Sequence, residues 1–379
     1  MAQASTEDWL ASVRRRKTKE YSVRAQRPRG ENPSIIRPKN LNELHGVMEP
    51  SAKRAKPIRP LGAGSAATAC ATAAGGTVID MTSMDDIVNI GDDTVTVQAG
   101  VRIAKLADAL EQHGKEIPGC IDLVNRTVGG AVASACIGPS LARDGGNFSS
   151  QVVALKAITP QGKLLTVDQR RGKLLEAYRL SYGMLGVIYE VTLKIRPLTS
   201  FVRKQKKMDV KSFTHAAERL AGTDVGIKFY LMPFKNQVFT ELRRHEVEAA
   251  DSKKQPWKLK DWGETAALPK ICGKLSSVVP IASLRYSLAD SLHGVSQSLL
   301  GNSLVSGGDA VEQGLSTTGS FAMPPLCYST WCFTATDLTM VLHGYIDFCR
   351  RYYKEHRFRC DSTAELSRAS LNPTAGMSQ

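Results

Sequence analysis

The sequence predicts an α+β protein of two domains, and three observations support this. Short β-branched runs bounded by turn residues recur up to about residue 195, which is typical of strands. Two glycine-rich segments lie among those runs. After Pro197, aromatic residues and basic clusters replace the glycine-rich turns. The 379 residues leave room for two domains of roughly 100–200 residues each.

The first domain is expected to combine strands with short helices. Ile103, Leu106 and Leu110 lie at helical spacing and predict a helix that Gly114 ends. The β-branched runs predict the strands. In chain order we expect strands at 77–81, 87–90 and 94–100, a helix over 103–113, strands at 152–158 and 164–167, a helix over 173–180 and a strand over 187–195.

The second domain is predicted to hold an antiparallel sheet flanked by helices. Strands over 225–231 and 236–243 are joined by a turn at Pro233-Phe234-Lys235. A buried strand is expected at 327–333 and an amphipathic helix over 337–353. The polar end of the chain resembles neither a strand nor a helix cap, so the second domain is expected to be incomplete.

The glycine-rich segments, 59–65 and 127–134, are the main candidates for a ligand site. Glycine lets backbone N–H groups approach a ligand that a Cβ atom would hold away, and successive N–H groups form concave sites for phosphate oxygens. Two such segments predict a pyrophosphate held from both sides. Their spacing matches neither the dinucleotide fingerprint Gly-x-Gly-x-x-Gly nor the nucleoside triphosphate loop. Close packing of the small residues at 64–76 stays open as an alternative.

Six segments, taken in order, resemble the FAD-binding domain of the vanillyl-alcohol oxidase superfamily. The most similar branch holds aldonolactone oxidases, alditol oxidases and decaprenylphosphoryl-ribose oxidase. The resemblance extends from about Ile36 to Pro197. The matching segments are Arg59-Pro60 with the first glycine-rich segment, 78–81, 95–100, 127–133, 148–153 and 183–188.

The resemblance implies that FAD is the cofactor, with its pyrophosphate between the two glycine-rich segments. It also implies that the strand beginning at Val187 places backbone groups beside the flavin or the adenine. The cofactor contacts carried over to this chain are Arg59, Pro60, Gly62, Ala63, Gly64, Ser65, Ala66, Pro118, Gly119, Thr127, Gly129, Gly130, Ser134, Gly138, Val187 and Ile188.

A departure from the family pattern at Ser65 predicts that FAD is bound non-covalently. Many members carry a histidine at this position that is bonded to the flavin. All seven histidines of this chain lie outside both glycine-rich segments. A link through Cys136 is the alternative, but we favour a buried, packed thiol.

The resemblance also sets the expected domain organisation. Residues 1–33 form an N-terminal basic segment, 34–198 the FAD-binding domain, 199–361 the substrate or cap domain, and 362–379 a polar tail.

The resemblance implies an oxidoreductase that oxidises an alcohol group of a sugar, sugar lactone or lipid-linked sugar by hydride transfer to FAD. The electron acceptor is left open. Two alternatives are an FAD-binding protein without turnover and a 2-hydroxy-acid dehydrogenase. Candidates for the group that removes the hydroxyl proton are Lys228, Tyr230 and Tyr328, with His245 and Lys354 as further choices. For Lys228 we favour the simpler explanation of a lysine on a solvated strand face.

The formal net charge of +14 suggests an anionic partner, but the basic runs contain no interleaved aromatic residues, so we expect no nucleic acid. An apolar stripe at helical spacing consists of Leu284, Leu288, Leu292, Val295 and Leu299. We favour packing of this stripe against its own domain, and contact with a membrane surface is the alternative.

The eight cysteines show no metal-ligand spacing and are interpreted as free thiols of a reducing compartment. No apolar run is long enough to span a bilayer, and the N-terminus lacks the pattern of a secretory signal. The sequence therefore predicts a cytoplasmic protein with no metal site, in peripheral contact with the inner face of the membrane if the stripe faces lipid.

Overall fold

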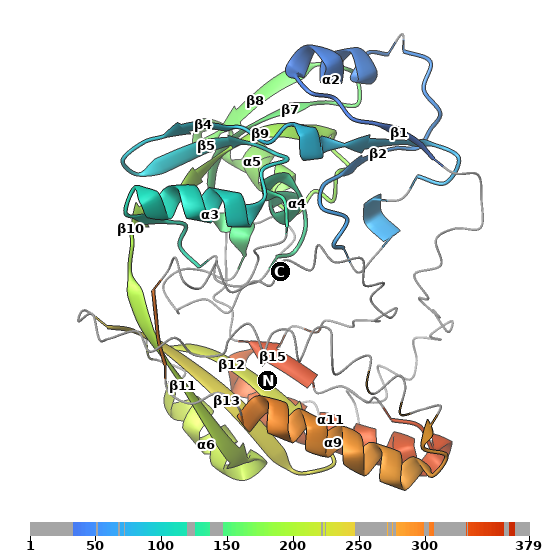
Figure 1. Ribbon diagram of the computed structural model, residues 1–379, viewed down its shortest axis with the longest axis vertical. Coiled ribbons are helices and arrows are strands. Elements are labelled where there is room, and N and C mark those ends of the chain that lie inside the picture. Colours follow the sequence, from blue (N-terminus) through green and yellow to red (C-terminus); the bar gives the residue numbers. More distant parts are fainter. Residues whose placement is uncertain are drawn as a thin grey trace, which may run out of the picture.

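The protein consists of two lobes, each built around a five-stranded sheet (Figure 1). Figure 1 shows the N-terminal lobe above and the C-terminal lobe below, with strands β10 and β11 running between them. The computed structural model describes residues 33–50, 52–66, 69–71, 73–119, 126–136, 147–220, 223, 225–246, 271, 275, 278–298, 303–306, 331, 333–359 and 364–367.

A small parallel sheet, in the order β1-β3-β2, begins the N-terminal lobe. Helix α2 covers it and starts at Asn40, whose side chain accepts a hydrogen bond from the backbone N–H of Glu43 at 2.9 Å. Leu44, Ile79 and Met84 form part of the core beneath the helix. The strand predicted at 77–81 is confirmed. The bounds are β1 Ser34–Ile36, α2 Leu41–Met48, β2 Ile58–Leu61 and β3 Thr77–Asp80.

An antiparallel sheet in the order β4-β5-β9-β7-β8 forms the centre of this lobe. Helices α3, α4 and α5 pack against it and share its largest apolar core. These strands and helices confirm the predictions from β-branched runs and helical spacing. The bounds are β4 Ile87–Ile90, β5 Thr94–Gln98, α3 Ile103–Gln112, α4 Val128–Ala133, β7 Val152–Ile158, β8 Leu164–Asp168, α5 Gly172–Tyr178 and β9 Val187–Lys194.

A short two-stranded antiparallel sheet lies where the chain passes from the N-terminal to the C-terminal lobe. Strand β10 (Arg196–Pro197) pairs with β6 (Lys115–Glu116), and Arg196 Nε bonds Glu116 Oε1 at 2.6 Å. The long strand β11 (Ser200–Asp209) then enters the sheet of the C-terminal lobe. The domain boundary near Pro197 stays a prediction.

The sheet of the C-terminal lobe has the order β14-β11-β13-β12-β15. Helices α6 and α11 cover one face of it, where Phe213, Phe229 and Leu342 lie in a common apolar core. Figure 1 places both helices on the side of the sheet remote from the N-terminal lobe. The bounds are α6 Val210–Leu220, β12 Gly226–Met232, β13 Gln237–Glu246, α9 Ala282–Ser298, β14 Ser303–Ser306, α11 Leu338–His356 and β15 Ala364–Ser367.

The predicted strands at 225–231 and 236–243 and the predicted helix at 337–353 are confirmed as β12, β13 and α11. The strand expected at 327–333 lies mostly outside the described residues. The expectation of no strand after residue 361 is wrong, because β15 pairs antiparallel with β12. Ala364 and Leu366 of β15 pack against the apolar core, and this burial, together with the free edge of β12, suffices to order a polar segment.

The prediction that the apolar stripe of α9 packs against its own domain is also wrong. The helix buries Tyr286 and Ala289, whereas Leu284, Leu288 and Val295 are exposed on the opposite side. Leu292 is partly buried. Leu299 lies outside the described residues. In the described part of the chain, no helix combines the length and the apolar character needed to cross a membrane.

Candidate cofactor site

The two glycine-rich segments touch each other. A Cβ atom built on Gly62 would lie 2.1 Å from Thr127 Oγ1, far inside van der Waals contact. Gly62 follows strand β2, and Thr127 immediately precedes helix α4. The absence of a side chain at residue 62 therefore allows segments that are 65 positions apart in sequence to meet.

The first glycine-rich segment leaves several backbone amides unused within the described structure. Within the described structure, the N–H groups of Ala63, Gly64, Ser65 and Ala66 donate no hydrogen bond to protein atoms. Gly64 has a positive φ of 66°, a conformation that glycine adopts at little cost. Amides without a protein acceptor suit the oxygens of a phosphate group.

The second segment uses several of its amides internally. Gly129 N donates to Ala99 O at 2.8 Å, and Gly130 N donates to Thr127 Oγ1 at 3.3 Å. A Cβ atom on Gly129 would lie 2.7 Å from Ala99 Cβ, so this glycine is required by the packing of α4 against the sheet. Gly129 and Gly130 stay predicted cofactor contacts, with their own N–H groups already partly engaged. The hydroxyl of Ser134 donates to Gly130 O at 2.7 Å.

A third segment, residues 180–186, contacts both glycine-rich segments. Leu180 N donates to Val132 O and Tyr182 N to Ala133 O, which fixes this segment along α4. A Cβ atom on Gly183 would lie 2.7 Å from Pro60 Cγ, beside the first glycine-rich segment. The structure thus brings the predicted residues around Pro60, Thr127 and Val187 together. The side chains of Val187 and Ile188 are buried, so these two residues can offer only backbone groups to a ligand.

Two buried polar atoms beside the second segment have no partner among the described residues. These are Ser149 Oγ, on a residue with no exposed surface, and Asn147 Oδ1. The adjacent Phe148 N bonds Cys136 O at 2.9 Å, which ties both residues to the second segment. A buried hydroxyl and a buried amide oxygen are costly unless they are hydrogen-bonded. The polar groups of a bound FAD would satisfy them, so the chain's own residues fit this cofactor.

The thiol of Cys136 is enclosed by polar neighbours. Arg126 Nη1 lies 2.6 Å from Cys136 Sγ, and Ser134 Oγ lies 3.4 Å from it. Cys136 itself is buried. The sulfur therefore already has a donor within the protein, which supports the interpretation of a packed thiol rather than a flavin link.

Asp80 lies at the end of β3, opposite Leu61 in the register. Its burial tends to raise the pKa, but hydrogen bonds from the side chains of Thr82 and Arg37 outweigh it and hold the pKa of this carboxyl below its usual value. Arg37 Nε reaches Asp80 Oδ2 at 2.7 Å. This ionised carboxylate joins Arg37 and Thr82 beside the strand that pairs with β2.

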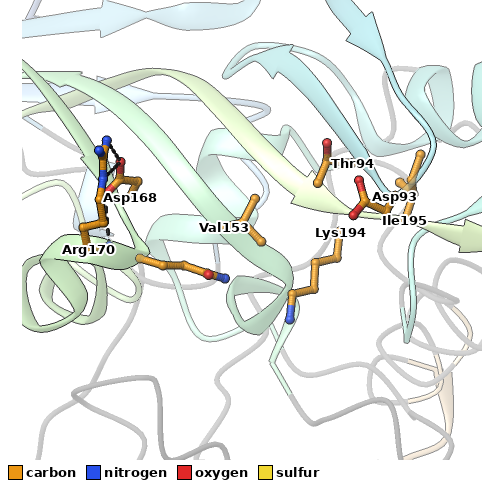
Figure 2. Close-up of a pocket in the computed structure, with 8 residues that line it drawn as sticks. Asp93, Thr94, Val153, Asp168, Arg170, Lys194 and Ile195 are labelled. Atoms are coloured by element: carbon orange, nitrogen blue, oxygen red, sulfur yellow. Dashed lines mark hydrogen bonds and ion pairs between the residues drawn. The ribbon is translucent and has the colours of Figure 1, made fainter.

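A cavity of about 540 Å³ lies elsewhere in the same lobe (Figure 2). It lies at the ends of β5, β7, β8 and β9, and none of the predicted cofactor residues lines it. The side chain of Arg170 bonds the carboxylate of Asp168, which lowers the pKa of Asp168. Lys194 extends away from Asp93. The lining residues are Asp93, Thr94, Val153, Asp168, Gln169, Arg170, Lys194 and Ile195.

The catalytic candidates Lys228 and Tyr230 lie together on β12, as their alternation predicts. Lys228 Nζ lies 5.3 Å from the centre of the Tyr230 ring. They point to the face of the sheet that α6 and α11 do not cover, because the intervening Ile227, Phe229 and Leu231 belong to the core with those helices. Pro118 and Gly119 end a described segment beyond α3, and Gly138 and Tyr328 lie outside the described residues.

Sequence reasoning missed a buried ion pair on the same face. Arg243 Nε and Nη2 both lie 2.6 Å from Glu241 Oε1, and the two side chains are 1% and 2% exposed. Glu241 is the cross-strand partner of Lys228. The signal was present in the sequence, since residues 239, 241 and 243 alternate with the apolar-side residues 238, 240 and 242 of a predicted strand.

Residues 33–168 match the protein-family model described as FAD binding domain. This part of the chain is an FAD binding domain, and it is similar to that of the vanillyl-alcohol oxidase superfamily. FAD is its cofactor. The prediction from the six ordered segments is therefore confirmed for the family, the fold and the cofactor. The individual contact residues stay predictions.

Relatives of this FAD-binding domain include enzymes named for sugar lactones. The chain is 28% identical over 211 residues to L-gulono-1,4-lactone dehydrogenase of Mycobacterium tuberculosis, which is 55% of this chain and 48% of the relative. It is 28% identical over 167 residues to L-gulonolactone oxidase of Bos taurus, covering 43% and 37% of the two chains. The chain thus spans about half the length of the first relative and less of the second.

A solved structure with a similar fold is the cholesterol oxidase of Brevibacterium sterolicum. The two superpose with a TM-score of 0.63 at 14% identity, over 87% of this chain and 68% of that chain. At this identity the likeness concerns the fold, and it extends over both lobes.

Replacing Gly62 by alanine should separate the two glycine-rich segments. The new Cβ would overlap Thr127 Oγ1, so we expect a loss of about 1–3 kcal/mol in the free energy of unfolding and at least a tenfold increase in the Kd for FAD. Flavin fluorescence titration and thermal unfolding measure the two effects. Gly46→Ala is the control, because nothing lies within 4 Å of a Cβ there. Wild-type FAD affinity in Gly62→Ala would contradict the contact.

Precipitating the FAD-loaded protein with acid tests the non-covalent prediction. Since Ser65 occupies the histidine position and Cys136 Sγ is held by Arg126, the yellow colour should stay in the supernatant. Absorbance at the flavin band is read in both fractions. Colour retained in the washed pellet would mean that a covalent bond exists.

Proposed function

We propose that this protein oxidises a CH–OH group of a polyhydroxylated substrate, such as a sugar or sugar lactone, with FAD as the hydride acceptor. The buried pair Glu241–Arg243, on the sheet face free of α6 and α11, carries the proposal. The FAD-binding domain and the names of the lactone dehydrogenase and oxidase relatives support it.

The pair offers complementary hydrogen-bonding groups to a diol. A guanidinium only donates, and a carboxylate only accepts, so adjacent hydroxyl groups can bind both at once. Tyr230 and Lys228, on the neighbouring strand, add a hydroxyl and a further cation beside Glu241. This arrangement orients a polyol through several polar contacts.

The burial of Glu241 and Arg243 supports their proposed role in binding a polar ligand. A charge pair with almost no exposed surface interacts strongly because little water screens it, but taking both charges out of water is expensive. Apolar residues of similar volume at positions 241 and 243 would fill the same space without the desolvation free energy of two charges. Retaining the pair is therefore better explained by binding a polar ligand than by stability.

FAD, when bound, takes the hydride from the substrate carbon, and the hydroxyl proton must pass to a basic group. In this proposal Glu241 accepts a hydrogen bond from the reacting hydroxyl, and its bond from Arg243 Nε supports a fixed orientation of the carboxylate. Lys228 and Tyr230 stay the predicted candidates for taking the proton.

We also propose a reducing, cytoplasmic environment. Cys70 and Cys136 form no disulfide in the described structure, which supports this location.

Anaerobic mixing of the FAD-loaded protein with alditols, aldonolactones and 2-hydroxy acids tests the function. We expect an alditol or an aldonolactone to bleach the flavin band, since the pair suits neighbouring hydroxyl groups. Bleaching by 2-hydroxy acids alone would identify a 2-hydroxy-acid dehydrogenase. No bleaching by any compound, in protein with stoichiometric FAD, would identify an FAD-binding protein without turnover.

Variants of the pair separate substrate binding from folding. Glu241→Gln leaves Arg243 buried without its countercharge and should cost about 3–5 kcal/mol of stability. The double variant Glu241→Gln with Arg243→Gln removes both charges and should be more stable than the single variant. Flavin reduction should nevertheless fall at least a hundredfold in both variants, while FAD content stays at wild-type level.

The half-buried pair Arg196–Glu116 is the matched control for this experiment. Its neutral double variant, Arg196→Gln with Glu116→Gln, should reduce flavin as fast as wild type. Stopped-flow absorbance gives the reduction rates, and chemical unfolding gives the stabilities. A Glu241/Arg243 double variant with wild-type reduction would show that the pair is only structural.

A further inference from the structure

The outward side of helix α9 is an apolar surface on an otherwise strongly basic protein. Val278, Ile281, Leu284, Leu288 and Val295 are exposed, by between 39% and 74%. From 281 to 295 they follow helical spacing and cover roughly 20 Å of helix length. This surface, hereafter the α9 surface, is more continuous than the scattered exposed apolar residues of ordinary surfaces.

The opposite side of α9 is firmly fixed to the lobe, so the α9 surface points away from it. Arg359 donates to Tyr286 O and to Asp290 Oδ1, each at 2.8 Å. The guanidinium of Arg359 also lies 4.4 Å from the ring centres of both Tyr286 and Phe234. Because these contacts hold one side, the exposed side cannot be buried by rotating the helix.

Basic and aromatic residues surround the end of α11 that meets α9. Tyr353 packs edge-on against Tyr286 at 5.7 Å. Residues 350–358 contain four cations, Arg350, Arg351, Lys354 and Arg357, against the single carboxylate of Glu355. All five of these charged side chains are exposed, as are Tyr352 and Phe358. Lysine, arginine and aromatic side chains around an apolar strip are typical of contact with a lipid headgroup region.

We propose that the α9 surface docks on the surface of an anionic lipid bilayer. The α9 residues insert their side chains at the level of the headgroups, and the basic end of α11 contacts lipid phosphates. Charge selects this occupant over a second copy of the chain, because two molecules of net charge +14 repel each other whereas an anionic bilayer attracts both.

The position of α9 determines what this contact does. Figure 1 shows α9 on the side of the C-terminal lobe remote from the FAD-binding lobe. Docking there anchors the molecule and leaves the cofactor lobe facing the aqueous phase. A substrate would therefore reach the flavin from solution while the protein is held at the membrane.

Flotation of the FAD-loaded full chain with liposomes tests the proposal. We expect binding to vesicles of phosphatidylcholine with about one-third phosphatidylglycerol at low salt, and at least tenfold weaker binding to pure phosphatidylcholine. The variant Leu284→Glu with Leu288→Glu should lose at least tenfold in partitioning to the anionic vesicles. Arg351→Glu with Lys354→Glu should weaken binding and reduce its salt dependence.

The matched control is Val88→Glu with Leu164→Glu, which adds the same charge at comparably exposed positions of the FAD-binding lobe. It should bind vesicles nearly as well as wild type. Wild type that stays unbound by anionic vesicles at low salt would overturn the proposal, as would α9 variants that bind like this control. A concentration-dependent dimer in analytical ultracentrifugation, lost in the α9 variant, would assign the α9 surface to self-association instead.

Discussion

The close approach of Gly62 to Thr127 is the constraint on which the cofactor site depends. Strand β2 and helix α4 belong to different parts of the N-terminal lobe, and only a residue without a side chain lets them meet at this distance. Once they meet, Pro60 and Gly183 come into contact as well, and Thr127 caps the start of α4. The amides of residues 63–66 then lie near the start of α4, and among the described residues they have no acceptor. The site therefore depends on the steric fit between Gly62 and Thr127.

The two faces of the C-terminal sheet carry different kinds of side chain. The face toward α6 and α11 is apolar and supplies the core of the lobe. The other face carries Glu241, Arg243 and Lys228 beside a buried apolar cluster of Tyr230, Met232 and Phe239. This face therefore combines packing of its own with the polar groups that we propose for a ligand.

Local signals made much of the FAD-binding lobe predictable. The β-branched runs and helical spacings concern neighbouring residues, so β5, β7, β9 and α3 follow from the sequence directly. The meeting of Gly62 and Thr127 was predictable only through the resemblance to a known family. The internal engagement of Gly129 N was not, because its partner Ala99 is 30 positions away and carries no distinguishing signal.

The C-terminal lobe was harder to predict because its decisive features depend on distant partners. Strand β15 is polar in sequence and is ordered by the edge of β12, more than 130 positions earlier. The α9 stripe has the spacing of a packed helix, yet its other side, with Tyr286 and Ala289, is the one that the fold buries. Glu241 and Arg243 lie in a predicted strand, but their burial depends on residues outside it and has no local signal.

Arg359 links parts of this lobe that are far apart in sequence. Its guanidinium lies between Phe234, in the turn from β12 to β13, and Tyr286 of α9, and it precedes β15 by five positions. A single side chain therefore connects the start of the final strand to the outer helix and to a hairpin turn formed more than 120 positions earlier. The position of α9 and the approach of the chain to β15 are set by the same guanidinium.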